Sequence, residues 1–149
     1  MQKIAISACL LGRHCRYDGG ENLNDVLLEQ LDGYELLPFC PEDYCFGTPR
    51  PTMDLIANSD DNKAISNLDG KDLSKPILSY ANNFFDKNPD IDLFIGKDRS
   101  PSCGVRSAKL YDKNKKLLSE QESGIMSKIA KKRAIKCIDA EQYCSKPML

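Results

Sequence analysis

Three cysteines occupy positions at which an α/β chain commonly builds its functional site. Cys9, Cys40 and Cys103 each follow, closely or within a few residues, a short apolar run that is typical of a buried strand. In open α/β sheets, ligands bind in the crevice at the carboxyl ends of the strands, so thiols from three strands can meet there. A free cysteine is also commonly a small buried apolar side chain, and that interpretation suits a single cysteine best. The three positions together favour a shared site.

The residues that follow these cysteines suit loops whose backbone approaches a ligand. Gly12, Pro41 and Gly104 come after the three cysteines in turn. Such loops let main-chain N–H groups point at an anion or at bridging sulfides. Of the other cysteines, Cys15 could equally support this site or pack in the fold. The remaining three are expected to be mainly structural: Cys45, Cys137 and Cys144.

The donor set leaves two kinds of metal site open. The chain has a single histidine, His14, which excludes a site built from several histidines. Three thiolates could hold a zinc ion with one open position, although the short C-x-x-C pairs of structural zinc sites are absent. An iron–sulfur cluster normally takes four cysteine thiolates. Three would leave one iron without a protein ligand and open to a substrate, which would serve catalysis rather than electron transfer.

Polar residues beside the cysteines could move protons or bind a substrate. Glu42 lies two positions after Cys40 and could act as a general acid or base, or could be a solvated loop carboxylate. Ser100 and Ser102 precede Cys103, where the ordinary role of serine is turn capping. Arginines in or beside these loops could bind phosphate or carboxylate, or could be surface charges: Arg13, Arg16, Arg50, Arg99 and Arg106.

The elements that must position these residues alternate between strands and helices. We expect buried strands at 3–8, 34–39, 90–96 and 134–138, and helices at 21–31, 73–85 and 123–132. We also expect a loop over 40–51, short extended pieces at 53–57 and 63–67, and a hairpin over 108–118. This alternation predicts an α/β fold: a single doubly wound (Rossmann/flavodoxin-like) three-layer domain with a mostly parallel sheet, spanning residues 1–149.

Composition and charge exclude several classes of protein. The 21 basic and 22 acidic residues give a net charge of −1, which excludes a broad basic surface for long nucleic acid but leaves room for a nucleotide pocket. No apolar stretch reaches the ~18–20 residues that a membrane span needs. Residues 6–9 are similar to a lipoprotein cleavage site, but the preceding segment is too short and alternates like a strand. We therefore expect a cytoplasmic protein, in which thiols stay reduced.

Five motifs, in order along the chain, carry a resemblance to a known family. They are Ser-Ala-Cys-Leu-Leu-Gly at 7–12, Cys-Arg-Tyr-Asp-Gly at 15–19, Cys-Pro-Glu at 40–42, Gly-Thr-Pro-Arg-Pro at 47–51 and Ser-Pro-Ser-Cys-Gly at 100–104. The chain resembles the small bacterial domain-of-unknown-function family that includes the thiouracil desulfidases. Looser similarity extends through residues 123–125 and 134–137, so the resemblance covers nearly the whole sequence.

The resemblance implies a cofactor, a substrate class and a set of site residues. It implies a [4Fe-4S] cluster held by Cys9, Cys40 and Cys103, with the fourth iron free to bind the sulfur of thiouracil or 4-thiouridine monophosphate. Glu42 and Ser100 match the positions proposed to handle protons and substrate. The implied chemistry is hydrolytic and not redox: the open iron acts as a Lewis acid, and a water activated by Glu42 attacks the ring carbon.

Two other functions remain as alternatives at this point. One is a thiol-based sulfurtransferase or redox protein without iron, which would use Cys9 with Cys15 or Cys40. The other is a non-catalytic iron–sulfur or metal-binding module. In the desulfidase case the expected partner is a small thiolated molecule, possibly a mononucleotide, with neither long nucleic acid nor a membrane involved.

Overall fold

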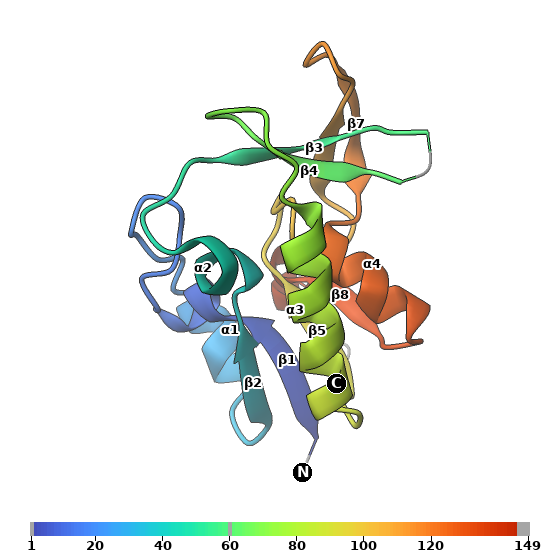
Figure 1. Cartoon of the computed structure of the whole chain (residues 1–149). Coiled ribbons are helices and arrows are strands. Elements are labelled where there is room, and N and C mark those ends of the chain that lie inside the picture. Colours follow the sequence, from blue (N-terminus) through green and yellow to red (C-terminus); the bar gives the residue numbers. More distant parts are fainter. Residues whose placement is uncertain (1, 60, 146–149) are drawn as a thin grey trace.

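The strands of this protein form two separate sheets. The computed structural model describes residues 2–59 and 61–145, which contain eight strands and five α-helices (Figure 1). Four strands build a parallel sheet in the order β2-β1-β5-β8, and four build a mixed sheet in the order β4-β3-β6-β7. The expected α/β class is confirmed, but the expectation of one mostly parallel sheet accounts for only half of the strands.

The parallel sheet consists of the strands that the apolar runs predicted. These are β1 (Lys3–Ser7), β2 (Glu35–Phe39), β5 (Leu93–Gly96) and β8 (Cys137–Asp139), each shorter than expected. Every neighbouring pair is parallel, and Ile6 of β1 lies between Pro38 of β2 and Ile95 of β5. Parallel strands are covered on both faces, and the central pair here is accordingly apolar along nearly its whole length.

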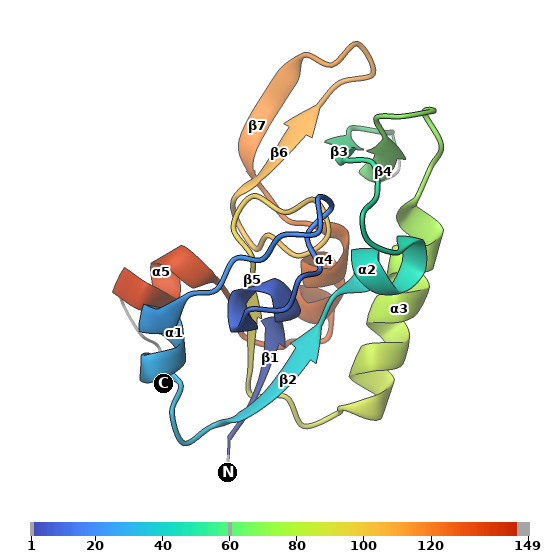
Figure 2. The same ribbon diagram turned by 90° about the vertical axis from the view of Figure 1, so that its left-hand side faces the viewer.

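Helices cover both faces of the parallel sheet. On one face, α1 (Asp25–Gln30) and α5 (Ala140–Ser145) pack against β1 and β5, as Figure 2 shows. On the other face lie α3 (Ser74–Lys87) and α4 (Ile125–Lys132), whose apolar side chains contact Phe39 and Phe94. The rings of Phe39 and Phe94 stack with centroids 4.8 Å apart, which ties the ends of β2 and β5 together. This part of the chain has the three layers that the sequence predicted.

The mixed sheet was not predicted as a separate unit. It contains β3 (Met53–Ile56), β4 (Lys63–Ser66), β6 (Ala108–Tyr111) and β7 (Leu117–Glu122). The expected hairpin is confirmed as the antiparallel pair β6–β7, and the two expected extended pieces as the antiparallel pair β3–β4. Alternate side chains of β3 and β4 are buried, because one face of this sheet packs on Ile77 of α3 and Ile125 of α4.

Three local expectations need correction. The segment expected to be a loop over 40–51 contains α2 (Pro41–Phe46), which begins with a proline in its first turn, where proline is pre-organised for a helix. The helix expected over 21–31 starts only at Asp25, because the Asn24 side chain caps it by accepting a hydrogen bond from the Leu27 amide. The tail carries α5, which the sequence did not predict. Among the described residues, no helix is long and apolar enough to cross a membrane.

The loop that follows β5 folds back closely over the end of its own strand. A Cβ atom added to Gly96 would lie 1.8 Å from the backbone oxygen of Cys103, and one added to Gly124 would lie 2.6 Å from the backbone carbon of Ser102. Glycine is therefore required at both positions by close backbone approach and not by a left-handed conformation. Because Gly96 and Gly124 have no side chain, the backbone of residues 102–103 can lie close to both.

We expect Gly96→Ala to destabilise the protein by about 1–3 kcal/mol, since the new methyl group meets backbone that must shift. Urea unfolding followed by circular dichroism measures this change. Gly20→Ala is the matched control, because the added Cβ would meet only the flexible side chain of Asp18. Equal stability of the two variants would contradict the close approach.

Candidate functional site

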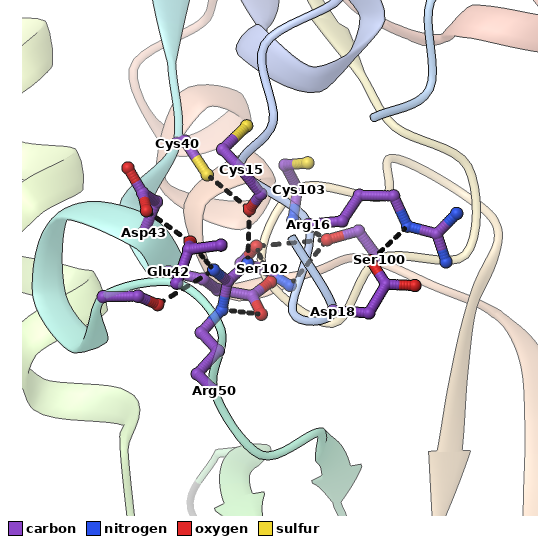
Figure 3. A network of polar contacts seen from close by, with 12 residues as sticks. Cys15, Arg16, Asp18, Cys40, Glu42, Asp43, Arg50, Ser100, Ser102 and Cys103 are labelled. Atoms are coloured by element: carbon purple, nitrogen blue, oxygen red, sulfur yellow. Dashed lines mark hydrogen bonds and ion pairs between the residues drawn. The ribbon is translucent and has the colours of Figure 1, made fainter. Parts of the chain in front are cut away.

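A cavity of about 470 Å³ opens at the carboxyl end of the parallel sheet. Cys9, Cys40 and Cys103 all line it, together with Glu42 and Ser100. The structure thus brings together the five site residues that the sequence singled out. Figure 3 shows the thiols of Cys15, Cys40 and Cys103 on one side of this region, and Glu42, Arg50 and Ser102 next to them.

Each candidate ligand comes from the end of a different strand. Cys9 lies in a short 3₁₀ helix (Ala8–Leu11) directly after β1, Cys40 lies between β2 and α2, and Cys103 lies in the loop after β5. The Cys40 amide donates to the Tyr80 hydroxyl oxygen of α3 at 3.1 Å, which fixes the start of α2. The neighbouring parallel strands β2, β1 and β5 therefore deliver the three thiols to the same edge of the sheet.

Cys9 and Cys103 are buried and their sulfurs accept hydrogen bonds from N–H groups, while Cys40 is half-buried. The Lys97 amide donates to Cys103 Sγ at 3.4 Å, and the Asn22 side-chain amide donates to Cys9 Sγ at 3.5 Å. Burial raises the pKa of Cys40 to about 12 and that of Cys103 to about 12. These two thiols are consequently neutral at pH 7 in the metal-free protein, and a metal centre would have to displace their protons.

The sequence left two kinds of metal site open, a zinc ion and an iron–sulfur cluster. Among residues 2–59 and 61–145, no three His, Cys, Asp or Glu side chains are grouped so as to hold one metal ion. Three sulfurs bound to a single zinc would all lie about 2.3 Å from it. A cluster places each thiolate on a separate iron and so needs its ligands further apart. Three cysteines line one cavity, Cys9 and Cys103 buried and Cys40 half-buried, and N–H groups donate to two of their sulfurs; this arrangement is compatible with a cluster that has one unliganded iron.

Glu42 is held by an arginine and a serine. Its Oε2 accepts a hydrogen bond from Ser102 Oγ at 2.7 Å, and its Oε1 lies 3.6 Å from Arg50 Nε. The side chain of Glu42 is 17% exposed and that of Arg50 is 6% exposed, so this ion pair is largely removed from water. Glu42 is therefore not a solvated loop carboxylate. It stands in the second position of α2 with a fixed orientation toward the loop that carries Cys103.

The structure gives the two serines different contacts. Ser100 Oγ accepts the amide N–H groups of Ser102 and Cys103, each at 3.2 Å, and so shapes the turn around the cysteine. Its hydroxyl also lies 3.1 Å from the Ser102 hydroxyl. Ser102, which is 2% exposed, makes the direct contact with Glu42. The sequence singled out Ser100, but the serine that touches the carboxylate is Ser102.

Arg50 is the main residue whose importance the sequence did not show. Its Nη2 donates to the Cys15 carbonyl oxygen at 2.8 Å, and its Nη1 donates to the Gly47 carbonyl and to Thr48 Oγ1 at 3.1 and 2.7 Å. The sequence placed it among five arginines that could each be surface charge. Its signals in the sequence were its place in the Gly-Thr-Pro-Arg-Pro motif at 47–51 and its position a few residues after Glu42.

The remaining candidates divide by location. Cys15 lines the cavity, and its carbonyl oxygen also accepts a weak contact from Cys40 Sγ at 3.8 Å. The lining does not include the other cysteines or two of the arginines, namely Cys45, Cys137, Cys144, Arg13 and Arg106. Four basic side chains but only two acidic ones line the cavity: Arg16, Arg50, Lys97 and Arg99 against Glu42 and Asp98. Arg16 and Arg99 are paired with Asp18 and Glu141 outside the lining, so the acidic and basic charges at and next to the cavity are equal in number.

Comparison with known proteins identifies relatives with matching architecture. A solved structure described as the [4Fe-4S]-dependent thiouracil desulfidase TudS (DUF523Vcz) is 27% identical, with a TM-score of 0.76 over 95% of this chain and 93% of that chain. The uncharacterized protein YbbK of Bacillus subtilis (strain 168) is 28% identical over 109 residues, which are 68% of this chain and 72% of that protein. The 2-thiouracil desulfurase family matches residues 4–142, a span that contains Glu42 and the three candidate ligands Cys9, Cys40 and Cys103. The chain therefore belongs to the 2-thiouracil desulfurase family.

Proposed function

We propose that this protein is an iron–sulfur-dependent desulfidase that removes sulfur from a thiolated pyrimidine. The observation that carries the proposal is the meeting of the thiols of Cys9, Cys40 and Cys103 and the largely buried carboxylate of Glu42 in a single cavity. Family membership and the description of the similar solved structure as a [4Fe-4S]-dependent thiouracil desulfidase support it. The cavity, at about 470 Å³, lies within the range of ~300–1,000 Å³ that is usual for small-molecule sites.

Cys9, Cys40 and Cys103 would hold the cluster. When bound through three thiolates, a [4Fe-4S] cluster supplies an iron without a protein ligand, and this iron can polarise a thiocarbonyl sulfur as a Lewis acid. The N–H groups of Lys97 and Asn22 that donate to the sulfurs would stabilise the thiolate form of their ligands.

The protein's own residues supply the proton chemistry. The net reaction replaces a C=S bond by C=O, consumes one water and releases one hydrogen sulfide, so no electrons are gained or lost. Glu42 is the base that accepts a proton from the attacking water. Ser102 donates to Oε2 and thereby leaves Oε1 as the oxygen that can take this proton. The buried position of the carboxylate limits competition from bulk water.

The charges of the cavity bear on the form of the substrate. Because Arg16, Lys97 and Arg99 in the lining are side chains of the kind that binds phosphate, we propose a substrate with negative charge, such as a thiolated mononucleotide, rather than a free base. Steady-state rates for 4-thiouridine monophosphate and for 2-thiouracil compare the two directly. A higher kcat/KM for the free base would overturn this choice of substrate while leaving the desulfidase proposal intact.

The experiment that tests the proposed function measures iron, acid-labile sulfide and sulfide release after anaerobic reconstitution. We expect about four iron and four sulfide per chain with broad absorption near 400 nm, together with release of hydrogen sulfide from thiolated pyrimidines. Reconstituted protein without iron would favour the thiol-based sulfurtransferase. Bound iron with no turnover of any thiocarbonyl would favour a non-catalytic module.

We expect Cys103→Ser to lose the cluster and keep the fold, because serine is close in size to cysteine and the larger side chains of the buried cluster around Cys103, such as Phe39 and Phe94, stay in place. Iron content and the visible spectrum report the loss, and far-ultraviolet circular dichroism reports the fold. Cys45→Ser is the matched control, since that thiol contacts the Pro76 carbonyl outside the cavity lining. A full complement of iron in Cys103→Ser would remove Cys103 from the ligand set.

We expect Glu42→Gln to keep the cluster and to lower kcat by about 10²–10⁴-fold, since an amide cannot accept the proton of the water. Reconstituted variants compared by sulfide release measure the effect. Glu29→Gln on the exposed surface of α1 is the control and should behave as the wild type. Unchanged turnover in Glu42→Gln would remove this carboxylate from the mechanism.

The two serines should respond differently to substitution. Ser102→Ala removes the hydrogen bond to Glu42, so we expect lower kcat with normal iron content. Ser100→Ala removes the acceptor of the Cys103 amide, so we expect weaker retention of iron on exposure to air. The time course of the visible spectrum in air, set beside kcat, separates the two effects. The reverse pattern would assign Ser100 to catalysis and Ser102 to the turn.

A further inference from the structure

One buried donor in the cavity wall has no partner in the protein. Within the described residues, Arg50 Nε and Gln30 Oε1 are the buried side-chain polar atoms without a hydrogen bond. Gln30 lies on α1, and its Oε1 is not part of the cavity lining. Arg50 Nε belongs to a lining residue whose side chain is only 6% exposed. A buried N–H group without a partner is costly, so this atom is expected to have a ligand.

The rest of the Arg50 side chain is fixed. Its two terminal nitrogens donate to two backbone carbonyls and a threonine hydroxyl, while its backbone amide donates to the Tyr17 carbonyl at 2.8 Å. The guanidinium is planar, so these bonds also set the direction in which the Nε–H group points. The free donor is therefore held in place before any ligand arrives.

The Glu42 carboxylate lies just beyond hydrogen-bonding range of this donor. Arg50 Nε and Glu42 Oε1 are 3.6 Å apart, which is too long for a direct N–H···O bond. A water about 2.8–2.9 Å from both atoms would lie to one side of the pair, on the cavity side, and not between them. Such a water would accept from Nε and donate to Oε1. The other carboxylate oxygen is already engaged by Ser102, so Oε1 is the available acceptor.

We infer that Arg50 and Glu42 together hold the water that attacks the thiocarbonyl carbon, an inference that rests on the proposed function. Arginine stays protonated in proteins, so Nε always donates and the water can orient in one way only. One lone pair accepts from Nε, one hydrogen points to Oε1, and the second lone pair remains for the substrate.

The reaction then balances as follows. An O–H bond of the water breaks, its proton passes to Glu42 Oε1, and its oxygen forms the new bond to carbon. As the new bond forms, the π electrons of the C=S bond move onto sulfur. The second O–H bond then breaks, its electron pair forms C=O, and the C–S bond breaks with its electron pair on sulfur. The sulfur takes this second proton and the one held on Glu42, leaves as hydrogen sulfide, and Glu42 returns to its carboxylate form. Arg50 keeps its proton throughout. Its part is to hold the reacting oxygen in position, which fixed donors accomplish at no cost of reorganisation during the reaction.

The test uses Arg50→Met, Arg50→Lys and a matched control in the reconstituted protein. Arg133→Met is the control, because Arg133 also carries several hydrogen bonds, to Asp86 and Asn82, but lies outside the cavity lining. For Arg50→Met we expect unchanged iron content, KM within about threefold of the wild type, and kcat lower by about 10²–10³-fold. Arg50→Lys keeps a cationic donor, so its kcat should exceed that of Arg50→Met by at least about tenfold.

Each other outcome overturns the inference in a recognisable way. Loss of iron in both Arg50 variants, with the control intact, would make Arg50 a structural residue. A large rise in KM with kcat kept would make it a substrate ligand. Equal kcat values for the methionine and lysine variants would exclude a role for the donor. A wild-type holoprotein that binds iron but releases no sulfide would instead overturn the proposed function itself.

A crystal structure of the wild-type protein gives a readout that is independent of turnover. We expect an ordered water within hydrogen-bonding distance of both Arg50 Nε and Glu42 Oε1, and its loss in Arg50→Met. A direct bond between Nε and Oε1, with no water shared between them, would contradict the inference.

Discussion

The buried guanidinium of Arg50 connects the segments on which the cavity depends. It donates hydrogen bonds to the carbonyl oxygen of Cys15 and to that of Gly47 in the turn that ends α2. It also lies beside Glu42 at the start of the same helix. A charge that is removed from water must be compensated by partners, so each of these segments is drawn to one point. The loop over 15–17, the helix α2 and the turn after it therefore all contact this one residue.

The parallel sheet supplies the other half of the arrangement. Its strands carry Cys9 and Cys40 to one edge directly, and the loop after β5 brings Cys103 back over that edge by passing close to Gly96. The stacked rings of Phe39 and Phe94 lie just before these chain segments, so the apolar core fixes the strand ends. Packing and thiol placement are thus consequences of the same register of parallel strands.

The sequence predicted those features that depend on local patterns. Four apolar runs gave the parallel strands, and their ends gave the three cysteines and Glu42 as neighbours. It failed where the outcome depends on contacts between distant segments. The mixed sheet requires β3 to pair in parallel with β6, about fifty residues later, and no local pattern encodes that pairing. The contact of Ser102, rather than Ser100, with Glu42 depends likewise on how two loops fold against each other. The role of Arg50 was hidden for the same reason, since its partners are mostly backbone carbonyls.

The two connections into the mixed sheet both start from the cavity. After α2 the chain passes through Arg50 into β3, and after Cys103 it continues into β6, while β3 and β6 pair with each other. The pairing of β3 with β6 thus connects the two chain segments that leave the cavity. In a shortened protein that contains only the parallel sheet and its helices, these two segments would lose the strand pairing that holds their far ends together. We therefore expect the mixed sheet to support the position of the cavity loops, and a shortened or recombined version of this fold should retain it.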